Sequence, residues 1–305
     1  MDEIQKTLLE QVADLHEVPE GAYNLRVNGQ AGGRRTTANI DIVTKEDKPG
    51  IDIIIRPGTV KESVHIPVLL SQTGLKDLVY NDFYIGENSD VTIVAGCGIH
   101  NAGDQASEHS GIHSFHVGRN SKVRYVEKHY GQGDGKGERI MNPTTEVELS
   151  EDAYMEMDTV QIKGVDSTKR CTKAVLGDGA TLVIREKLMT HGKQTAETAF
   201  EVELNGTGSS ANVISRSVAK EESKQIFLSK INGNNLCSGH SECDAIIMDQ
   251  ASVSAIPEIT ANHVDASLIH EAAIGKIAGE QIIKLMTLGL TEAEAEAQIV
   301  NGFLK

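Results

Sequence analysis

The sequence predicts a mainly β protein in which coils of strand stack into a flattened solenoid, with short helices at both ends. Three observations predict this fold class. Segments that alternate apolar and polar residues lie between turn residues along most of the chain, they recur about every 30 residues, and helical spacing of apolar residues occurs only near the two ends. Because no helical pattern separates the strands, a solenoid is favoured over a parallel sheet built from βαβ units.

Residues 1–20 are predicted to form a short amphipathic helix. Its first turn carries Asp2 and Glu3, where the helix dipole favours negative charge. Its apolar residues at helical spacing are Ile4, Leu8, Leu9, Val12 and Leu15. After Gly21 the pattern changes to short runs such as AYNLRVNG and IDIIIRPGT. Residues 21–87 are therefore predicted to be a β-rich segment that leads into the solenoid.

Residues 88–272 are predicted to form the β-helix core, because a turn followed by a half-buried strand recurs there, as in NSDVTIVAG, NSKVRYVEK and GDGATLVIR. We take one equivalent residue near each turn, namely Val91, Val123, Ala153, Ala180, Ala211, Ala251 and Ala266. The successive spacings between them are 32, 30, 27, 31, 40 and 15 residues. Most of these spacings are typical of stacked repeats. A β-sandwich, whose turns recur about every 8 to 12 residues, is the alternative.

Residues 273–305 are predicted to form a helix–turn–helix tail. Apolar residues recur at helical spacing from Ile274 to Leu288, and Gly289 ends the run. A capping box from Thr291 to Glu294 then begins a second helix. This tail is predicted either to cap the open end of the solenoid or to dock a partner protein.

Composition limits the classes of function. Apolar residues make up 39% of the 305 residues, but only 4% are aromatic and tryptophan is absent, so the core must be mainly aliphatic. A formal charge of −15 argues against binding nucleic acid or an anionic membrane surface. No run approaches the roughly 18 apolar residues of a spanning helix, and the start, Met1-Asp2-Glu3, does not resemble a signal peptide. A cytoplasmic protein is expected.

The densest group of potential ligands lies in the window 237–271. It contains Cys237, His240, Cys243, Asp244, His263, His270 and Glu271. With a coil of about 30 residues, Cys243 and Glu271 would lie close together on adjacent coils. Thiolate, imidazole and carboxylate suit iron or zinc. The chain lacks the compact four-cysteine motif of a permanent cluster, which favours a weakly held one. The alternative is a packed cysteine beside solvated acids.

A second group combines a cysteine with histidines, namely Cys97, His100, His109, His113, His116 and His129. On a helix, His109, His113 and His116 would share one face, but nearby glycines argue against a helix. In a strand, His113 and His116 would face opposite ways. A metal site and buried structural histidines remain alternatives here.

Other catalytic motifs are absent. The segment GQGDGKGER, residues 131–139, is glycine-rich and basic but lacks the spacing of a phosphate-binding loop, so a flexible loop is the simpler interpretation. No G-x-S-x-G elbow or H-E-x-x-H motif is present. The shortage of aromatic residues also argues against a carbohydrate-active β-helix enzyme. We expect the chain itself to be no enzyme.

Several segments resemble the SufB/SufD family of iron–sulfur cluster assembly scaffolds. They are AGC, KVRY, SECDAII, LIHEAAIGKI and GEQIIKLMTLGLTEAEAEAQIVNGF, in that order. The resemblance is strongest from about residue 207 to residue 303. It implies a right-handed parallel β-helix between helical ends, and it identifies the chain with compact SufB-like members.

The resemblance also implies roles for particular residues. Cys243 would be the principal site for sulfur acceptance or cluster attachment, with Glu271 and His270 as its companions and metal ligands. Cys97 would receive sulfur that moves through the β-helix interior. His129 falls where the family has a polar residue of that route, although the neighbouring tryptophan is absent. Cys237 is a further candidate ligand.

The implied cofactor is a transient iron–sulfur cluster, expected to be of the 4Fe-4S type, while flavin involvement stays open. ATP would enter only through a partner, a SufC-type ABC ATPase that docks on the C-terminal helices. Further expected partners are a second copy of the chain or a SufB/SufD paralogue, a cysteine desulfurase as sulfur donor, and apo iron–sulfur proteins. A SufD-like structural partner that binds no cluster is the alternative function.

Overall fold

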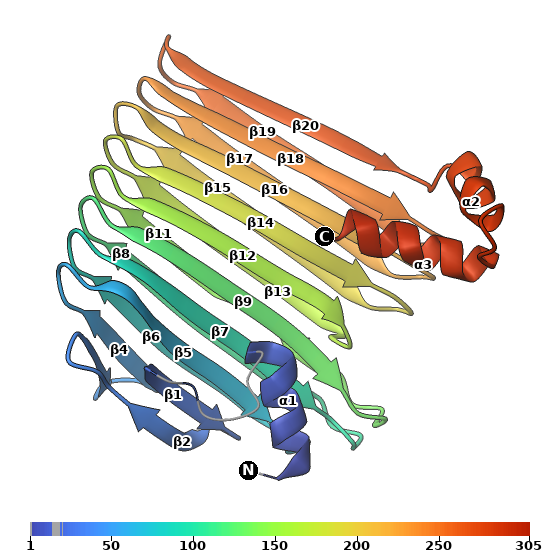
Figure 1. Ribbon diagram of the computed structural model, residues 1–305, viewed down its shortest axis with the longest axis horizontal. Coiled ribbons are helices and arrows are strands. Elements are labelled where there is room, and N and C mark those ends of the chain that lie inside the picture. Colours follow the sequence, from blue (N-terminus) through green and yellow to red (C-terminus); the bar gives the residue numbers. More distant parts are fainter. Residues whose placement is uncertain (1, 14–18, 20) are drawn as a thin grey trace.

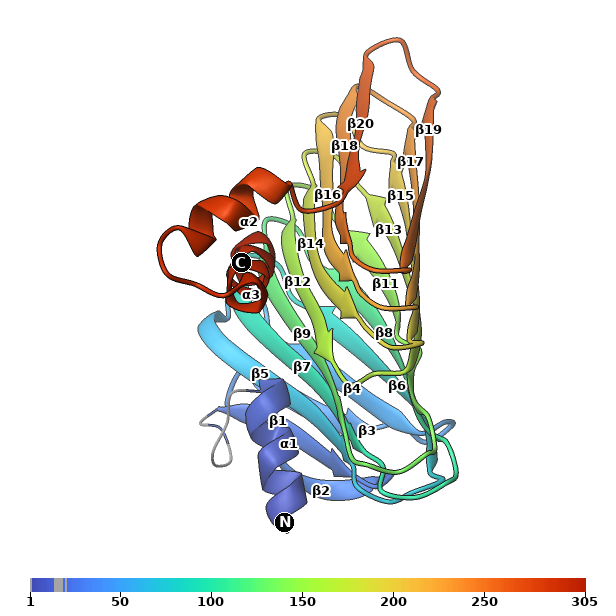
Figure 2. The same cartoon turned by 90° about the vertical axis from the view of Figure 1, so that its right-hand side faces the viewer.

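The computed structural model describes residues 2–13, 19 and 21–305, and its strands form two facing sheets (Figures 1 and 2). The first sheet has the order β2 (Gln30–Arg35), β1 (Ala22–Val27), β5 (Val60–Leu70), β7 (Asp90–His100), β9 (Lys122–Gln132), β12 (Tyr154–Lys163), β14 (Thr181–Thr190), β16 (Ser209–Ala219), β18 (Cys237–Ile247) and β20 (Ala266–Gly275). The second has the order β19 (Ser252–Ala261), β17 (Lys224–Gly233), β15 (Thr195–Leu204), β13 (Ser167–Leu176), β10 (Arg139–Met141), β8 (Ser107–Val117), β6 (Lys76–Ile85), β4 (Gly50–Ile55) and β3 (Ile40–Thr44), with β11 (Thr144–Leu149) between β13 and β8.

Each coil gives one main strand to each sheet, and neighbouring coils pair in parallel. The described exceptions are the antiparallel pairs β1–β2 and β3–β4 at the N-terminal end. The parallel solenoid that the sequence predicts is confirmed, and the β-sandwich alternative is wrong. Because β4 and β5 already pair in parallel with β6 and β7, stacking begins before residue 88.

The strand register corrects the phase of the repeat. The residues that follow one another across the first sheet are Val91, Val123, Met155, Leu182, Ala211, Gly239 and Leu268. Their spacings are 32, 32, 27, 29, 28 and 29 residues. Ala251 directly precedes β19 and so belongs to the second sheet. The irregular spacings of 40 and 15 arose because the sequence pattern mixed the two sheets.

Asparagine, aspartate and glycine at the turns explain why the repeat is visible in the sequence. Asn88, Asn120, Asp152, Gly179 and Gly208 lie on one edge of the solenoid and all have φ between 55° and 74°. These residue types adopt the left-handed region at least cost. The turns also stack, since Nδ2 of Asn120 donates to Oδ1 of Asn88 at 2.8 Å.

The core between the sheets is mainly aliphatic, as composition predicts, with a small aromatic group at its N-terminal half. Phe83 and Phe115 stack with ring centroids 4.3 Å apart, and Tyr125 meets Phe115 edge-on at 4.9 Å. All three side chains are fully buried. These rings fill the interior where the two sheets face each other.

The N-terminal helix α1 (Glu3–Ala13) covers part of the outer face of the first sheet (Figure 2). Its buried side chains Leu8 and Val12 lie against β7 at Gly96 and Gly98. A Cβ on Gly96 would come within 2.4 Å of the Val12 carbonyl oxygen, so glycine is required for this close approach. The predicted helical residue Leu15 lies outside the described residues.

The predicted tail is confirmed as α2 (Gly279–Met286) and α3 (Glu292–Phe303), and the capping box of Thr291 and Glu294 is formed. Val300 and Leu304 pack against Val218 at the flank of the first sheet. The helices therefore lie beside the sheet and leave the last coil, β19 and β20, uncovered (Figure 1). Capping of the open end, one predicted role, is not what the tail does. None of the described helices is long and apolar enough to span a membrane.

We predict that Phe115→Ala lowers the free energy of unfolding by about 3 to 5 kcal/mol, because it leaves a cavity beside Phe83. Urea unfolding followed by circular dichroism measures the change. Tyr84→Ala is the control, because Tyr84 is 42% exposed on the outer face, and it should cost less than about 1 kcal/mol. Equal losses in the two variants would contradict the assigned packing.

Candidate functional site

A row of polar side chains runs through the interior of the first sheet. Its members occupy the same inward position on β9, β12, β14, β16 and β18, and strand pairing places each beside the next: Glu127, Thr159, Glu186, Ser215 and Cys243. None is more than 5% exposed. Since the strands of a sheet lie about 4.8 Å apart, a line of polar groups crosses five coils and ends at a cysteine. We call it the polar row.

Cys97 lies on the adjacent inward row, one strand before the polar row begins. It pairs with His129, which pairs with Gln161. The Nδ1 of His129 lies 3.3 Å from Oε1 of Gln161. Burial raises the pKa of the Cys97 thiol, and the nearby charge of Glu127 raises it further. A small internal cavity of about 10 Å³ touches Cys97, His129 and Glu127.

One arginine from the second sheet balances the charges in this interior. Arg170, 5% exposed, forms an ion pair with Glu127, and its Nε lies 3.8 Å from Oε1 of Glu186. Burial opposes ionisation of Glu127, but Arg170 and His129 hold its pKa well below the usual value. Burial dominates at Glu186 and raises its pKa, although Arg170 and Ser215 oppose the shift. The two carboxylates therefore differ in proton affinity.

His113 links the second sheet to this ion pair. Nδ2 of Asn81 donates to its Nε2 at 3.3 Å, and its Nδ1 lies 2.8 Å from the hydroxyl oxygen of Tyr125. The Tyr125 hydroxyl donates to Oε1 of Glu127 at 3.1 Å. This order of donors requires a neutral imidazole with its proton on Nδ1. Burial lowers the pKa of His113 to about 4, in agreement with that state.

Cys243 closes the polar row near the open end of the solenoid. Its side chain is 1% exposed, and burial, with Glu186 and Asp244, raises its pKa to about 12. On the next strand His270 also faces inward, and its buried Nδ1 has no hydrogen-bond partner among the described residues. Burial and the charge of His240 lower the pKa of His270, so the neutral imidazole has a lone pair available for a metal.

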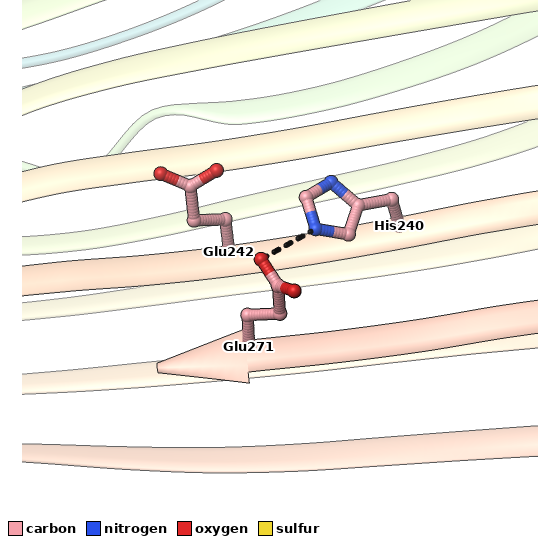
Figure 3. A group of neighbouring side chains, drawn as sticks. All are labelled: His240, Glu242 and Glu271. Atoms are coloured by element: carbon pink, nitrogen blue, oxygen red, sulfur yellow. Dashed lines mark ion pairs between the residues drawn. The ribbon is translucent and has the colours of Figure 1, made fainter. Parts of the chain in front are cut away.

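Glu271 lies on the other face of the sheet. The register places Glu271 beside Glu242, 29 residues away, and not beside Cys243. On the outer face Glu271, Glu242 and His240 offer one ligand atom each within 4.8 Å of one another (Figure 3). Nε2 of His240 lies 3.5 Å from Oε2 of Glu271. One nitrogen and two carboxylate oxygens suit a ferrous or similar divalent ion.

The structure therefore divides the predicted ligand set between two faces. Cys243 and His270 face the interior, whereas Glu271 faces outward with His240. The sequence pattern treated residues 28 apart as neighbours, but a register of 29 moves the side chain to the opposite face. Among the described residues, the outward trio is the one group of three possible metal ligands at this spacing.

The remaining predicted residues are also located. Cys237 faces inward at the start of β18 and is 6% exposed within the main core. As expected for a strand, His113 and His116 face opposite ways. His116 lies on the outer face, where its Nδ1 is 2.8 Å from Oε2 of Glu148. The histidine-rich strand β8 thus contributes to internal hydrogen bonding.

Sequence reasoning missed Glu127, Arg170 and Glu186, although a signal was present. In KVRYVEKHY the inward positions Val123 and Tyr125 are followed, in the same alternation, by Glu127 and His129. A charged residue in phase with buried residues predicts a charge in the interior. The partner of that charge, Arg170, is 43 residues away on the facing sheet, and only the closed fold brings it there.

We predict that His113 makes folding stability depend on pH. Its folded pKa of about 4 lies below its unfolded value, so its contribution is present above about pH 6.5 and is lost as the pH falls towards 4, by about 3 kcal/mol. The free energy of unfolding in urea should differ less between pH 7.5 and pH 4 for His113→Gln than for wild type. The exposed control His116→Gln should keep the wild-type difference. An unchanged difference in His113→Gln contradicts the assignment.

Comparison with known proteins agrees with the resemblance in the sequence. The family model described as the SUF system FeS cluster assembly, SufBD core domain, matches residues 80–303. An iron–sulfur cluster assembly SufBD family protein of Archaeoglobus fulgidus is 31% identical over 85% of this chain and 69% of its own length. A SufBD family protein of Pyrococcus horikoshii is 30% identical over 77% of this chain and 71% of its own length. A third, from Methanothermobacter thermautotrophicus strain Winter, is 28% identical over 78% and 57%.

The chain spans a little over half the length of the Methanothermobacter relatives, with 57% and 53% of two of them matched. The matched region contains the polar row from β9 to β18, the last coil and the helices of the tail. The family model matches most of the chain, and the stacked fold agrees with it. The chain therefore belongs to the SufB/SufD family of iron–sulfur cluster assembly proteins.

Proposed function

We propose that this chain is a scaffold on which an iron–sulfur cluster is assembled and from which it is transferred. The observation that carries the proposal is the polar row, which ends at the buried thiol of Cys243 and begins beside Cys97. Buried charges are costly unless they are paired and hydrogen-bonded, so a charged row in the interior is unusual. Sulfur and iron are substrates in this scheme, and the chain supplies the route and the ligands.

Sulfur enters at Cys97. The Cys97 thiolate attacks the outer sulfur of a donor persulfide, such as that of a cysteine desulfurase, and the donor leaves as a thiolate, so no net oxidation occurs. Because burial raises the pKa of Cys97, the attack needs local opening and a proton acceptor. His129, the ladder neighbour of Cys97, is placed to take that proton. About five strand spacings of ~4.8 Å separate the strand of Cys97 from that of Cys243, too far for direct exchange, so a small thiol must take the outer sulfur from Cys97 and pass it to the Cys243 thiolate, leaving again as a thiolate.

Cluster assembly takes place at the C-terminal end. Cys243 supplies the thiolate and His270 a neutral nitrogen on the inner face, while Glu271, with His240 and Glu242, would hold incoming iron on the outer face. Nitrogen and oxygen ligands hold iron less firmly than thiolates, as transfer requires. Cys237, also inward on β18, is a further thiol within reach of the same interior. A transient 4Fe-4S cluster is the proposed product, and an external two-electron reductant converts each delivered sulfane sulfur to sulfide.

The Cys243 side chain is 1% exposed, so iron reaches the thiol only if the end of the solenoid opens, and opening would also lower the pKa that burial raises to about 12. The last coil has unpaired strand edges and exposed Ile256, Ile259 and Ile269, which suits a second copy of the chain or a SufB/SufD paralogue. The tail exposes Ile283 and Leu288, which suits docking of a SufC-type ATPase. ATP hydrolysis in that partner would alter the interface and expose Cys243.

The alternative is a SufD-like structural partner that completes an ATPase complex without holding a cluster. The 1% exposure of Cys243 favours this role, because a sealed thiol binds no metal. Iron and sulfide counts on protein purified anaerobically with the ATPase separate the two roles. A complex without iron and sulfide identifies the structural partner.

We predict that Cys243→Ser lowers the iron and sulfide retained after anaerobic reconstitution by about tenfold or more, since it removes the principal ligand. Glu271→Gln should lower retained iron while leaving transfer of labelled sulfur to Cys243 intact, because the two residues lie on opposite faces. Cys171→Ser is the matched control, with its thiol on the outward side of β13. Wild-type loading of Cys243→Ser would refute the site.

We predict that Cys97→Ser separates sulfur delivery from cluster binding. Assembly supplied by a cysteine desulfurase should fall about tenfold or more, whereas assembly from free sulfide should match wild type, because Cys243 is unchanged. Iron and acid-labile sulfide per chain are measured for both sulfur sources. Equal losses with both sources would place Cys97 in a structural role and contradict the route.

A further inference from the structure

A cleft lies away from the polar row, on the edge where the first sheet turns into the second. It has a volume of about 640 Å³, within the range of small-molecule sites. Three consecutive turns form it: the glycine-rich segment between β9 and β10, residues 163–166 between β12 and β13, and residues 191–194 between β14 and β15. The GQGDGKGER segment thus has a defined place in the fold.

The cleft is cationic on an acidic protein. Lys136, Lys163 and Lys193 line it, one from each turn, and none has a carboxylate partner within ion-pair distance among the described residues. Lys163 lies 5.9 Å from the ring centroid of Tyr130, another lining residue. A net charge of −15 would ordinarily repel anions, so three unpaired ammonium groups in one concavity mark a local exception.

The other charges of the cleft are already used to build it. Arg139 donates three hydrogen bonds to Asp166, two from its guanidinium at 2.7 and 3.0 Å and one from its backbone N–H at 2.8 Å, and its guanidinium also donates to the Gly133 carbonyl oxygen at 2.8 Å. The Arg139–Asp166 pair joins two of the turns. Glu138 is the other acidic residue that lines the cleft, and it takes no part in this pairing. The lysines are therefore free to meet a ligand, while Arg139 and Asp166 fix the wall.

Glycine keeps the floor of the cleft at the level of the backbone. A Cβ on Gly131 would lie 2.0 Å from the Gly164 carbonyl oxygen, and one on Gly164 would lie 1.9 Å from that of Gly131. The turns of adjacent coils therefore stack in direct backbone contact. This packing removes side chains from the floor and explains the hollow between the lysines.

We propose that this cleft binds a small phosphorylated ligand, of the size of a nucleoside diphosphate. Lysine ammonium groups are common phosphate ligands, and a glycine-lined floor lets a polyphosphate approach the backbone closely. The site lies outside the cysteine route, so the inference does not depend on the function proposed above.

The test is isothermal titration calorimetry on the full chain with pyrophosphate and with ADP, at 50 mM salt. Both should bind saturably, and Lys136→Gln/Lys163→Gln/Lys193→Gln should weaken binding tenfold or more. The charge-matched control is Lys122→Gln/Lys169→Gln/Lys224→Gln, whose three exposed lysines lie on the solenoid walls, and it should stay within about threefold of wild type.

Three results would overturn the proposal. If neither pyrophosphate nor ADP binds saturably, the cleft is not a phosphate site. An equal loss in the control variant shows that the affinity comes from general charge. If citrate binds as tightly as pyrophosphate, the cleft accepts any polyanion and does not select phosphate. The acidic surface of a partner protein would then be as good a ligand. Circular dichroism spectra should be unchanged in both variants, because all six lysines are exposed.

Discussion

In-register parallel stacking is the constraint on which the rest of this structure depends. Each strand pairs with its equivalent one coil away, so an inward position on one coil is next to an inward position on the next. Any residue type repeated at that position becomes a continuous line through the interior. Aliphatic residues produce the core in this way, and polar residues produce the row from Glu127 to Cys243 by the same geometry.

The polar row carries an energetic cost that the fold offsets locally. A buried carboxylate loses several kcal/mol of hydration, and the Arg170 guanidinium recovers part of it by pairing with Glu127 and approaching Glu186. Tyr125, Thr198 and Ser215 supply hydrogen bonds to the same two carboxylates. Replacement of a buried ion pair by well-packed aliphatic residues is often neutral or stabilising, so these contacts offset the cost of the buried charges without making the row a net source of stability.

The two ends of the solenoid differ in how they are finished. At the N-terminal end, antiparallel pairs and α1 cover the first coils, and Cys97 lies in a buried cluster with Val68 and Met141. At the C-terminal end, the helices turn aside onto the flank (Figure 2), and β19 and β20 keep one unpaired edge each, with His270 on β20 and Cys243 on the neighbouring β18. Exposed strand edges favour pairing with another chain. The candidate ligands His270 and Glu271 therefore lie on an edge strand.

The sequence by itself determined the solenoid, the helices at both ends and the capping box, because local periodicity and turn residues are written along the chain. It could not place Glu271, since a one-residue difference between an expected spacing of 28 and the real register of 29 reverses the face of a strand. It also could not join Arg170 to Glu127, which lie on different sheets. Only the tertiary structure decided these contacts, because register and the facing of two sheets depend on the packing of the whole coil.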